Sequence, residues 1–418
     1  MKIRAITLGA SLTHNKQSLD SLKTQLESIT ELRKQFLDNN IDVQTVRLCT
    51  NPYDINSNYD DDFYSRIPET LDFIDSLTRE KLLAYYSYLP GLCDQQQSLS
   101  STQRRVMQEL PNYLAKHAAM FSSVQVSSVE NGISLEAISS CARIIKELAE
   151  NDPFENLQFA ATFDVPPNTP FFPSAYHKGQ ISKISIALEA ADEVVNITRE
   201  FSESNRNLKW LEEKITTRFS EIYDEITDLV KPFCTKHKIG FSGMDFSPAQ
   251  YPIEEKSIGT AIENITLSHF GEVGTVFAIG FLTSTLQKIN RPKIGFSGFM
   301  QPLLEDFTIA KRHDEKKFSL PQMLLNSTVC GLGLDCIPLP GDVSEESLTL
   351  LMMDVAMISS RIHKPLTCRL MPIPGKSNAE RTEFDFEFFT NSKICEIHPS
   401  SHSKKLKDFL SQNPSFLI

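Results

Sequence analysis

The feature that most constrains this chain is the regular alternation of strand-like and helix-like segments through its first 165 residues. Short apolar runs take turns with segments whose apolar residues recur at helical spacing, as Leu22, Leu26 and Ile29 do. Strands that are joined by helices pair in parallel, in a sheet or in a barrel. The predicted strands are 3–12, 43–53, 84–92, 120–128 and 157–165, and the predicted helices are 15–40, 66–82, 101–117 and 133–150.

The remainder of the chain begins with a loop rich in proline and aromatic residues, 166–180. Helices are predicted after it at 182–200, 206–231, 320–329 and 344–361, with a turn over 330–342 and a strand from 366. We expect one α/β domain over 1–394, made of an N-terminal half (1–165), a helical insertion (166–235) and a C-terminal half (236–394), and then a polar tail at 395–418.

Composition excludes several classes of function. Asp and Glu number 53 against 42 Lys and Arg, and this net charge of -11 argues against nucleic acid as a partner. No apolar run approaches the ~18 residues of a membrane span, and no signal peptide is predicted, so we expect a cytoplasmic protein without a membrane partner. The eight cysteines form no CxxC pair and no GxGxxG follows the first strand, so NAD, haem and a zinc ribbon are not expected.

Two short sequences recur in the C-terminal half. KIGFSG occurs at 238–243 and at 293–298, while a Pro-x-Pro-Gly sequence with a charged residue after it occurs at 338–342 and 372–376. Glycine lets a backbone or a ligand approach closely, and proline stiffens a loop. The repeats therefore indicate either loops that converge on one pocket or ordinary turns at the ends of strands.

Carboxylates near these loops are the candidate catalytic residues. They are Asp245, Glu305, Asp335 and Asp342, all at predicted ends of strands or helices. Two carboxyl groups in unequal environments can exchange protons as acid and base. Alternatively, Asp245, Asp335 and Asp342 are candidate ligands for Mg²⁺ or another divalent cation. Asp342 is equally well placed to cap the helix predicted from 344.

Candidate residues for binding a substrate lie in both halves of the chain. An arginine at the end of a strand can bind a carboxylate or phosphate through two hydrogen bonds, although it can also form a structural salt bridge. The Gly-Lys-Ser at 375–377 lacks the spacing of a phosphate-binding loop, so its lysine is only a possible anion ligand. The candidates are Arg47, Asn51, Ser242, Ser297 and Lys376.

Cys330 is a candidate nucleophile because it directly precedes the glycines of CGLGLD. No neighbouring residue in the sequence supplies a base for it. A buried, inert thiol is the alternative.

Several of these segments together resemble the family called domain of unknown function 711. They are KIRAITLG, VQTVRLCTNP, GFSGMDFSP, EEKSIGTAIE, CGLGLDCIPLPGD and HKPLTCRLMPIPGK. The resemblance implies an α/β barrel like that of pyruvate formate-lyase, with about ten strands, surrounding helices and an inner hairpin. It makes CGLGLD a candidate for that hairpin and places Cys330 near the reactive cysteine of the radical enzymes. The Arg-Val-x-Gly-Tyr/Phe segment of those enzymes is absent, and the last glycine is Gly375, so a typical glycyl radical enzyme is not expected.

The sequence favours an enzyme that acts on a polar, anionic metabolite through acid/base or Mg²⁺-assisted chemistry. A non-catalytic, metabolite-binding regulatory protein is the alternative, and a thiol or radical enzyme using Cys330 is the third. A pair of carboxylates within about 10 Å of each other would favour the enzyme over the regulator. We also expect a homo-oligomer.

Overall fold

The strands of the chain join in a single sheet. The computed structural model describes residues 2–13, 15–53, 61–94, 98–398 and 403–416, and within them the sheet has twelve strands. Its path runs β10 (Gly333–Pro340), β11 (Leu366–Ile373), β7 (Phe159–Phe163), β5 (Met120–Ser128), β3 (Tyr85–Ser87), β2 (Asp42–Thr50), β1 (Lys2–Ala10), β8 (Lys183–Glu189) and β9 (Gly240–Asp245), with β4 (Gly91–Leu92), β6 (Gly132–Ser134) and β12 (Ser415–Phe416) off this path.

The direction of the strands changes twice along this sheet. The five strands from β7 to β1 are parallel to one another, which confirms the parallel pairing predicted for the N-terminal half. β8 is antiparallel to β1 at one side and β11 is antiparallel to β7 at the other, while β9 and β10 continue parallel to β8 and β11. The segment 293–302 touches both outer strands, through parallel bridges from Lys293 to Met244 and from Pro302 to Asp335.

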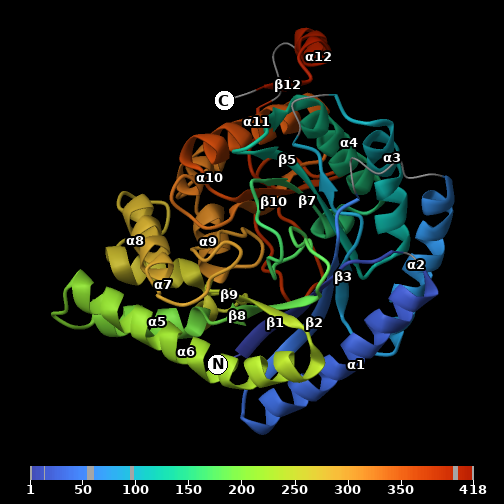
Figure 1. The fold of residues 1–418 in the computed structure, drawn as a ribbon. Coiled ribbons are helices and arrows are strands. Elements are labelled where there is room, and N and C mark those ends of the chain that lie inside the picture. Colours follow the sequence, from blue (N-terminus) through green and yellow to red (C-terminus); the bar gives the residue numbers. More distant parts are fainter. Residues whose placement is uncertain (1, 14, 54–60, 95–97, 399–402, 417–418) are drawn as a thin grey trace.

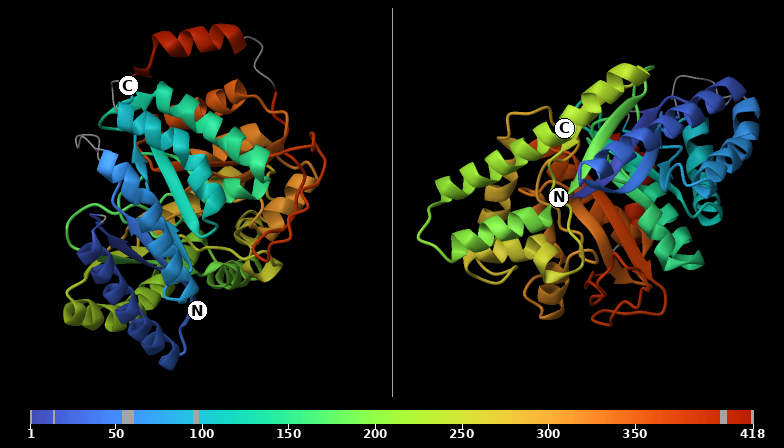
Figure 2. Two further views of the ribbon diagram at one scale, coloured as in Figure 1. Left: turned by 90° about the vertical axis from the view of Figure 1, so that its right-hand side faces the viewer. Right: turned by 90° about the horizontal axis from the view of Figure 1, so that it is seen from below.

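Helices lie around the outside of the strands, and the loop after β7 lies in the middle of the view in Figure 1. The apolar stripe of α1 is buried as predicted, at Leu22, Leu26, Ile29 and Leu32. The helices are α1 (Lys16–Asp38), α2 (Asp61–Arg79), α3 (Ser101–Lys116), α4 (Leu135–Asn151), α5 (Ala191–Ser202), α6 (Leu208–His237), α7 (Ile258–Thr266), α8 (Thr275–Gln287), α9 (Phe307–Asp314), α10 (Leu320–Ser327), α11 (Glu345–Ile362) and α12 (Ser403–Gln412), with 3-10 turns at Pro153–Gln158 and Glu254–Lys256. Helix α12 lies at the periphery, beyond the rest of the chain (Figure 2).

Two of the predicted elements are wrong. Residues 183–189 form strand β8 and not the start of a helix, because Ile184, Ile186 and Leu188 alternate with period two before the helical stretch of α5 begins. The turn predicted over 330–342, with the candidate inner hairpin in it, is largely strand β10, all of whose residues are buried. Pro338 and Pro340 fit there because β10 is an outer strand in the strand order. On its outer side, a residue without an N–H group breaks no hydrogen bond to a neighbouring strand.

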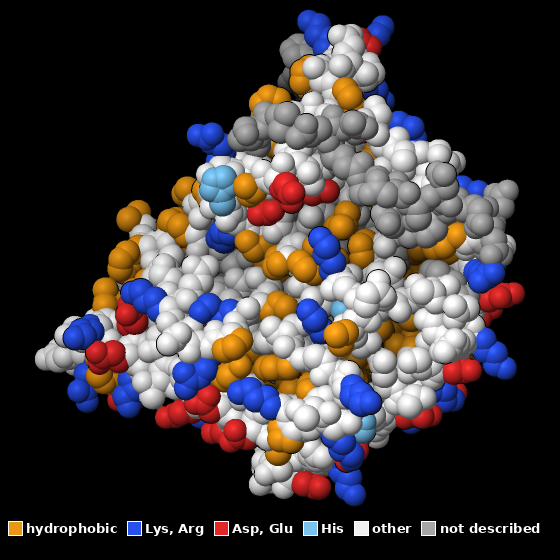
Figure 3. Space-filling view, viewed as in Figure 1, with side chains coloured by type: hydrophobic (Ala, Val, Ile, Leu, Met, Phe, Trp, Pro, Cys, Tyr) orange, Lys and Arg blue, Asp and Glu red, His pale blue; other side chains and the backbone are white. Residues whose placement is uncertain are grey.

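The outer face of α8 is apolar. This helix contains no charged residue, and the exposed side chains on and before it include Phe277 and the fully exposed Val273. Apolar side chains gather over α8 and α10 at the edge of the molecule in Figure 3. The homo-oligomer predicted above remains a prediction.

Among the described residues, no helix combines the length and the apolar character needed to cross a membrane.

Asp306 joins the N-termini of two helices. Its Oδ1 accepts hydrogen bonds from the Ser257 hydroxyl at 2.5 Å and from the Ile309 amide at 3.0 Å, at the start of α9. Its Oδ2 accepts from the amides of Ile258 at 2.7 Å and Gly259 at 3.3 Å, at the start of α7. The buried carboxylate thereby satisfies backbone N–H groups that neither helix can pair by itself.

We expect Asp306→Asn to lower the free energy of unfolding by about 2–4 kcal/mol, because the substitution turns one acceptor oxygen into an N–H group that faces other N–H donors. Urea unfolding followed by circular dichroism measures the loss. Asp342→Asn, at an exposed position, is the matched control and should stay within ~0.5 kcal/mol of the wild type. Equal stability of the two variants would contradict the conclusion that Asp306 stabilises the N-termini of both α7 and α9.

Candidate functional site

A cavity of about 320 Å³ opens where the strands of both halves meet the loop after β7. This volume is at the lower end of the range for small-molecule sites. Much of its wall is aromatic, from Tyr85, Phe121, Phe154, Phe171, Phe172, Phe386 and Phe388. Its charged residues are Arg4, Arg47, Glu305, Asp335, Arg369 and Glu387.

Arg369 organises the buried carboxylates of the cavity. Its Nε and Nη2 donate to the two oxygens of Asp335 at 2.5 and 2.9 Å, and Nη2 also donates to Oε1 of Glu305 at 2.9 Å. Burial lowers the pKa of Arg369, but attraction to the carboxylates of Asp335 and Glu305 outweighs this and holds the pKa above its ordinary value. The guanidinium therefore stays charged, and it donates hydrogen bonds to two carboxyl groups that burial would otherwise destabilise.

Glu305 differs from Asp335 in having one oxygen that accepts no hydrogen bond from a described residue. Its Oε1 accepts from Arg369 and from the Cys336 thiol at 3.2 Å, while Oε2 lies 3.9 Å from Nη2 of Arg4. Arg4 in turn lies 3.4 Å from Glu189, and its guanidinium packs over the Phe388 ring at 4.9 Å. Oε2 is thus the carboxylate oxygen at this site that is available to a ligand.

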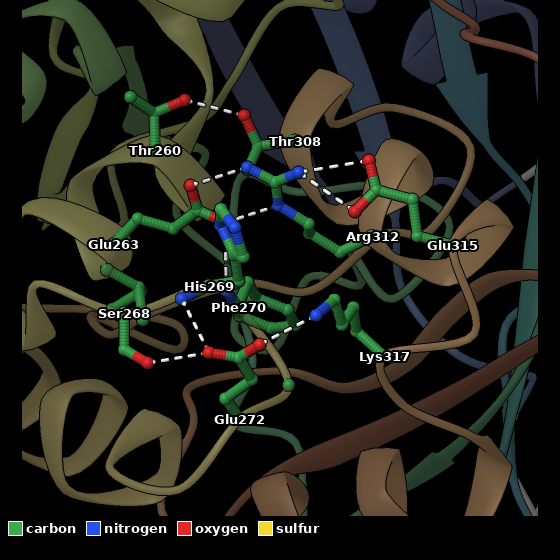
Figure 4. Close-up of polar contacts among 12 residues, drawn as sticks. Thr260, Glu263, Ser268, His269, Phe270, Glu272, Thr308, Arg312, Glu315 and Lys317 are labelled. Carbon is green, nitrogen blue, oxygen red and sulfur yellow. Dashed lines mark hydrogen bonds and ion pairs between the residues drawn. The ribbon is translucent and has the colours of Figure 1, made fainter.

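The position of Glu305 depends on α9, which begins two residues later. Arg312 of α9 donates to both oxygens of Glu263 on α7, at 2.6 and 3.0 Å, and to Glu315 at 2.9 Å (Figure 4). On the neighbouring loop, Glu272 pairs with Lys317 at 2.8 Å. Together with the Asp306 cap, this network fixes α9 against α7 and so fixes the chain that carries Glu305.

Arg47 of β2 is a buried cation without a carboxylate partner. Its side chain is only 9% exposed, Nε donates to Oγ1 of Thr45 at 3.0 Å, and the guanidinium lies 5.2 and 5.9 Å from the ring centres of Phe172 and Tyr85. No carboxylate of a described residue comes within 4.0 Å of it. Burial, and next the nearby charge of Arg4, lower the pKa of Arg47 to about 9. An anion in the cavity would supply the missing partner.

Three of the residues predicted from the sequence meet in this cavity: Arg47, Glu305 and Asp335. Asp245 does not line it. Both of its oxygens are used by the backbone, Oδ1 by the amides of Ser247 and Ser297 at 2.9 Å and Oδ2 by that of Phe296 at 2.7 Å, so it clamps the segment 293–298 to the end of β9.

The other predicted residues also lie outside the cavity lining. Asp342 is exposed, and the cap of α11 is Ser344. Asn51 and Ser297 join distant parts of the chain, by accepting hydrogen bonds from the amides of Leu12 and Phe246. Lys376 pairs with Glu383, and the fully buried Cys330 accepts from the Gly333 amide. The Ser242 hydroxyl is buried with no partner among the described residues.

The predicted metal ligands do not come together, because only Asp335 of the three lies in the cavity. A different group, Glu305, Asp335 and Cys336, has ligand atoms within 4.8 Å of one another. This group fits a hard cation such as Mg²⁺ poorly. Arg369 already donates hydrogen bonds to both carboxylates, and burial raises the pKa of the Cys336 thiol well above its ordinary value, so that it stays protonated.

Sequence reasoning missed Arg4, Arg369 and Gln250 in the cavity. A signal for the arginines exists, because Arg4, Arg47 and Arg369 each interrupt an apolar strand, in IRAI, VRLC and CRLM. An arginine on a fully buried strand needs a partner or a ligand. Gln250 has no such signal, since it lies in a loop and does not interrupt an apolar strand.

The residues that line the cavity, from Arg4 to Phe388, all fall in a span that is similar to known proteins. The family described as Uncharacterised ACR (DUF711) matches residues 1–392. The UPF0210 protein of Oenococcus oeni is 24% identical over 404 residues, which is 91% of this chain and 88% of that protein. Corresponding values for the UPF0210 proteins of Pyrobaculum aerophilum and Acetivibrio thermocellus are 26% over 392 residues (90% and 86%) and 24% over 415 residues (92% and 88%).

We expect Arg369→Met to lower the free energy of unfolding by about 3–5 kcal/mol, because it removes the cation paired with buried Asp335 and leaves Glu305 with only Arg4 at 3.9 Å. The double variant Arg369→Met/Asp335→Asn also removes the charge of Asp335 and should recover part of the loss. Urea unfolding at pH 7 measures both. A double variant that is no more stable than the single variant would show that the lost ion pair is not the cause.

The segment 379–395, which carries Phe386 and Phe388 to the cavity, is packed against α9 by a buried histidine. Nδ1 of His313 lies 3.2 Å from the hydroxyl of Ser392, and burial lowers the pKa of His313 to about 4. The folded state therefore favours the neutral imidazole, and protonation below the unfolded pKa of about 6.5 opposes folding.

Wild-type stability should accordingly fall by up to about 3 kcal/mol between pH 6.5 and 4 through this histidine alone, and His313→Asn should remove that part of the slope. Urea unfolding across this pH range measures the difference in slope. His363→Asn, at an exposed histidine whose positive φ asparagine tolerates, is the control and should keep the wild-type slope. Parallel curves for the wild type and His313→Asn would refute the assignment.

Proposed function

Since this chain belongs to the DUF711 family, whose description assigns no reaction, we propose from its own side chains that it is an enzyme acting on a small anionic molecule in the cavity. The observation that carries this proposal is Arg47, a buried cation beside empty space with no carboxylate partner among the described residues. Burying an unpaired charge is unfavourable, so such a residue is retained where a ligand completes it.

Each charged group has a distinct role in this proposal. Arg47 binds the anionic group of the substrate, and Oε2 of Glu305 accepts or returns a proton. Arg369 and Asp335 act as positioning residues, because they hold Oε1 of Glu305 and leave Oε2 free. Acid/base chemistry fits this arrangement better than Mg²⁺-assisted chemistry, since the guanidinium of Arg369 already occupies the position between the two carboxylates.

A barrel closed in the manner of pyruvate formate-lyase is also part of this proposal, as is a single domain over 1–394. Support comes from the segment 293–302, which is bridged in parallel to β9 at one end and to β10 at the other. Closure through this segment would bring strand ends of both halves around one cavity, which is where Arg47, Glu305 and Asp335 lie.

One observation favours the alternative, a non-catalytic protein that binds a metabolite. Oxygens of Glu305 and Asp335 lie within 4.8 Å of each other, inside the separation of about 10 Å for an acid/base pair, but both groups already accept hydrogen bonds from Arg369. Oxygens that are held by a guanidinium are less available to a substrate.

Anion binding is tested with Arg47→Met. Acetate or inorganic phosphate should raise the melting temperature of the wild type by mass action, and removal of the guanidinium should weaken this binding about 10-fold to 100-fold. Differential scanning calorimetry at constant ionic strength measures the shift. Without anion, Arg47→Met should be at least as stable as the wild type, because it removes an unpaired buried charge. Arg199→Met, at an exposed position, is the control, and an equal anion response in all three proteins would defeat the proposal.

Catalysis is tested with Glu305→Gln. The wild type is incubated with a defined mixture of carboxylate and phosphate metabolites, and mass spectrometry follows the loss of each. We expect one compound to be consumed by the wild type and at least about 100-fold more slowly by Glu305→Gln, while both proteins still bind anions. Binding without consumption by the wild type would favour the regulatory alternative.

A further inference from the structure

We infer that the ligand of the cavity is a monocarboxylate that carries a hydroxyl group and an apolar, planar body. This inference rests on the anion site proposed above. Three independent features of the cavity each specify one of these groups. They are the balance of buried charge, an unpartnered amide and the aromatic wall.

The balance of charge specifies one negative charge on the ligand. Glu387 also lines the cavity but is exposed, so water screens its charge. The remaining charged residues of the cavity, which are buried or nearly so, are Arg4, Arg47 and Arg369 against Glu305 and Asp335, a formal excess of one positive charge. Glu189 and Lys256 behind Arg4 pair with each other at 3.0 Å and leave this balance unchanged. One carboxylate neutralises the excess, whereas a phosphate dianion would leave a buried negative charge.

The amide of Gln250 specifies the hydroxyl group. This side chain is 3% exposed and lines the cavity, yet its Oε1 is buried with no hydrogen-bond partner among the described residues. A buried amide oxygen without a partner is destabilising, so a ligand that donates to it gains affinity. A hydroxyl can both donate to the oxygen and accept from the amide nitrogen. An ammonium group would add back the positive charge that the carboxylate removes.

The aromatic wall specifies the apolar body. Phe121 lies against Phe172 at 5.5 Å between ring centres, and Phe154 lies 5.1 Å from Phe386, so rings of the loop after β7 and of the segment 379–395 come together there. Such faces and edges pack well against another planar ring. The volume of about 320 Å³ limits the ligand to one small molecule, which then meets Arg47 and Gln250 in the same cavity.

A panel of probes that differ by one group tests this inference. Mandelate contains the carboxylate, the hydroxyl and the ring; phenylacetate lacks the hydroxyl, 2-phenylethanol lacks the carboxylate, lactate lacks the ring, and inorganic phosphate offers only an anion. Isothermal titration calorimetry measures each with the wild type, Arg47→Met and Gln250→Met. We expect mandelate to bind about tenfold tighter than phenylacetate and tighter still than the others.

The variants assign each group to its residue. Gln250→Met should bind mandelate and phenylacetate equally, and Arg47→Met should lose the advantage of the carboxylate over the alcohol. Tighter binding of phosphate than of every carboxylate would overturn the inference while leaving the anion site in place. No anion-dependent binding by the wild type to any probe would overturn both the inference and the proposed function.

Discussion

The ion-paired guanidinium of Arg369 is the interaction on which the arrangement of the cavity depends. It joins three parts of the chain that are distant in sequence: its own strand β11, Asp335 on β10, and Glu305 just before α9. A fourth contact, to the carbonyl of Leu157 at 3.4 Å, reaches the N-terminal half. Because these groups are buried or nearly so, the loss of Arg369 would leave Asp335 without the guanidinium that binds both of its oxygens.

Arg47 shows the opposite condition within the same cavity. It is as buried as Arg369 but has the hydroxyl of Thr45 and two aromatic rings around it in place of a carboxylate. The different surroundings give the two arginines opposite pKa shifts. The two arginines therefore differ in role under the proposed function. Arg369 supports the structure of the cavity, and Arg47 is left to bind a ligand.

Much of the parallel part of the sheet was predictable, because α1 and β1, β2, β3, β5 and β7 follow the apolar periodicity of the sequence. The errors at β8 and β10 have different physical causes. The alternation of β8, at Ile184, Ile186 and Leu188, runs almost directly into the helical stretch of α5, so one helix is predicted over both elements. Strand β10 is buried on both faces, and its glycine and prolines imitate a turn. At the site, Arg47, Glu305 and Asp335 were predictable as charges near the ends of apolar segments, although Arg47 and Asp335 lie within β2 and β10 and Glu305 lies just before α9. Asp245 was misleading, because a carboxylate that binds backbone amides and one that binds a ligand have the same sequence context.

The incomplete partnering of Arg47 has a consequence for the lifetime of the protein in a cell. Under the proposed function, the buried charge lowers the stability of the folded chain when the cavity is empty, and an anion that fills the cavity restores that stability. The unfolded fraction, which proteases remove, therefore falls as the concentration of the ligand rises. Steady-state abundance of the protein would follow the supply of its own ligand, without any transcriptional control.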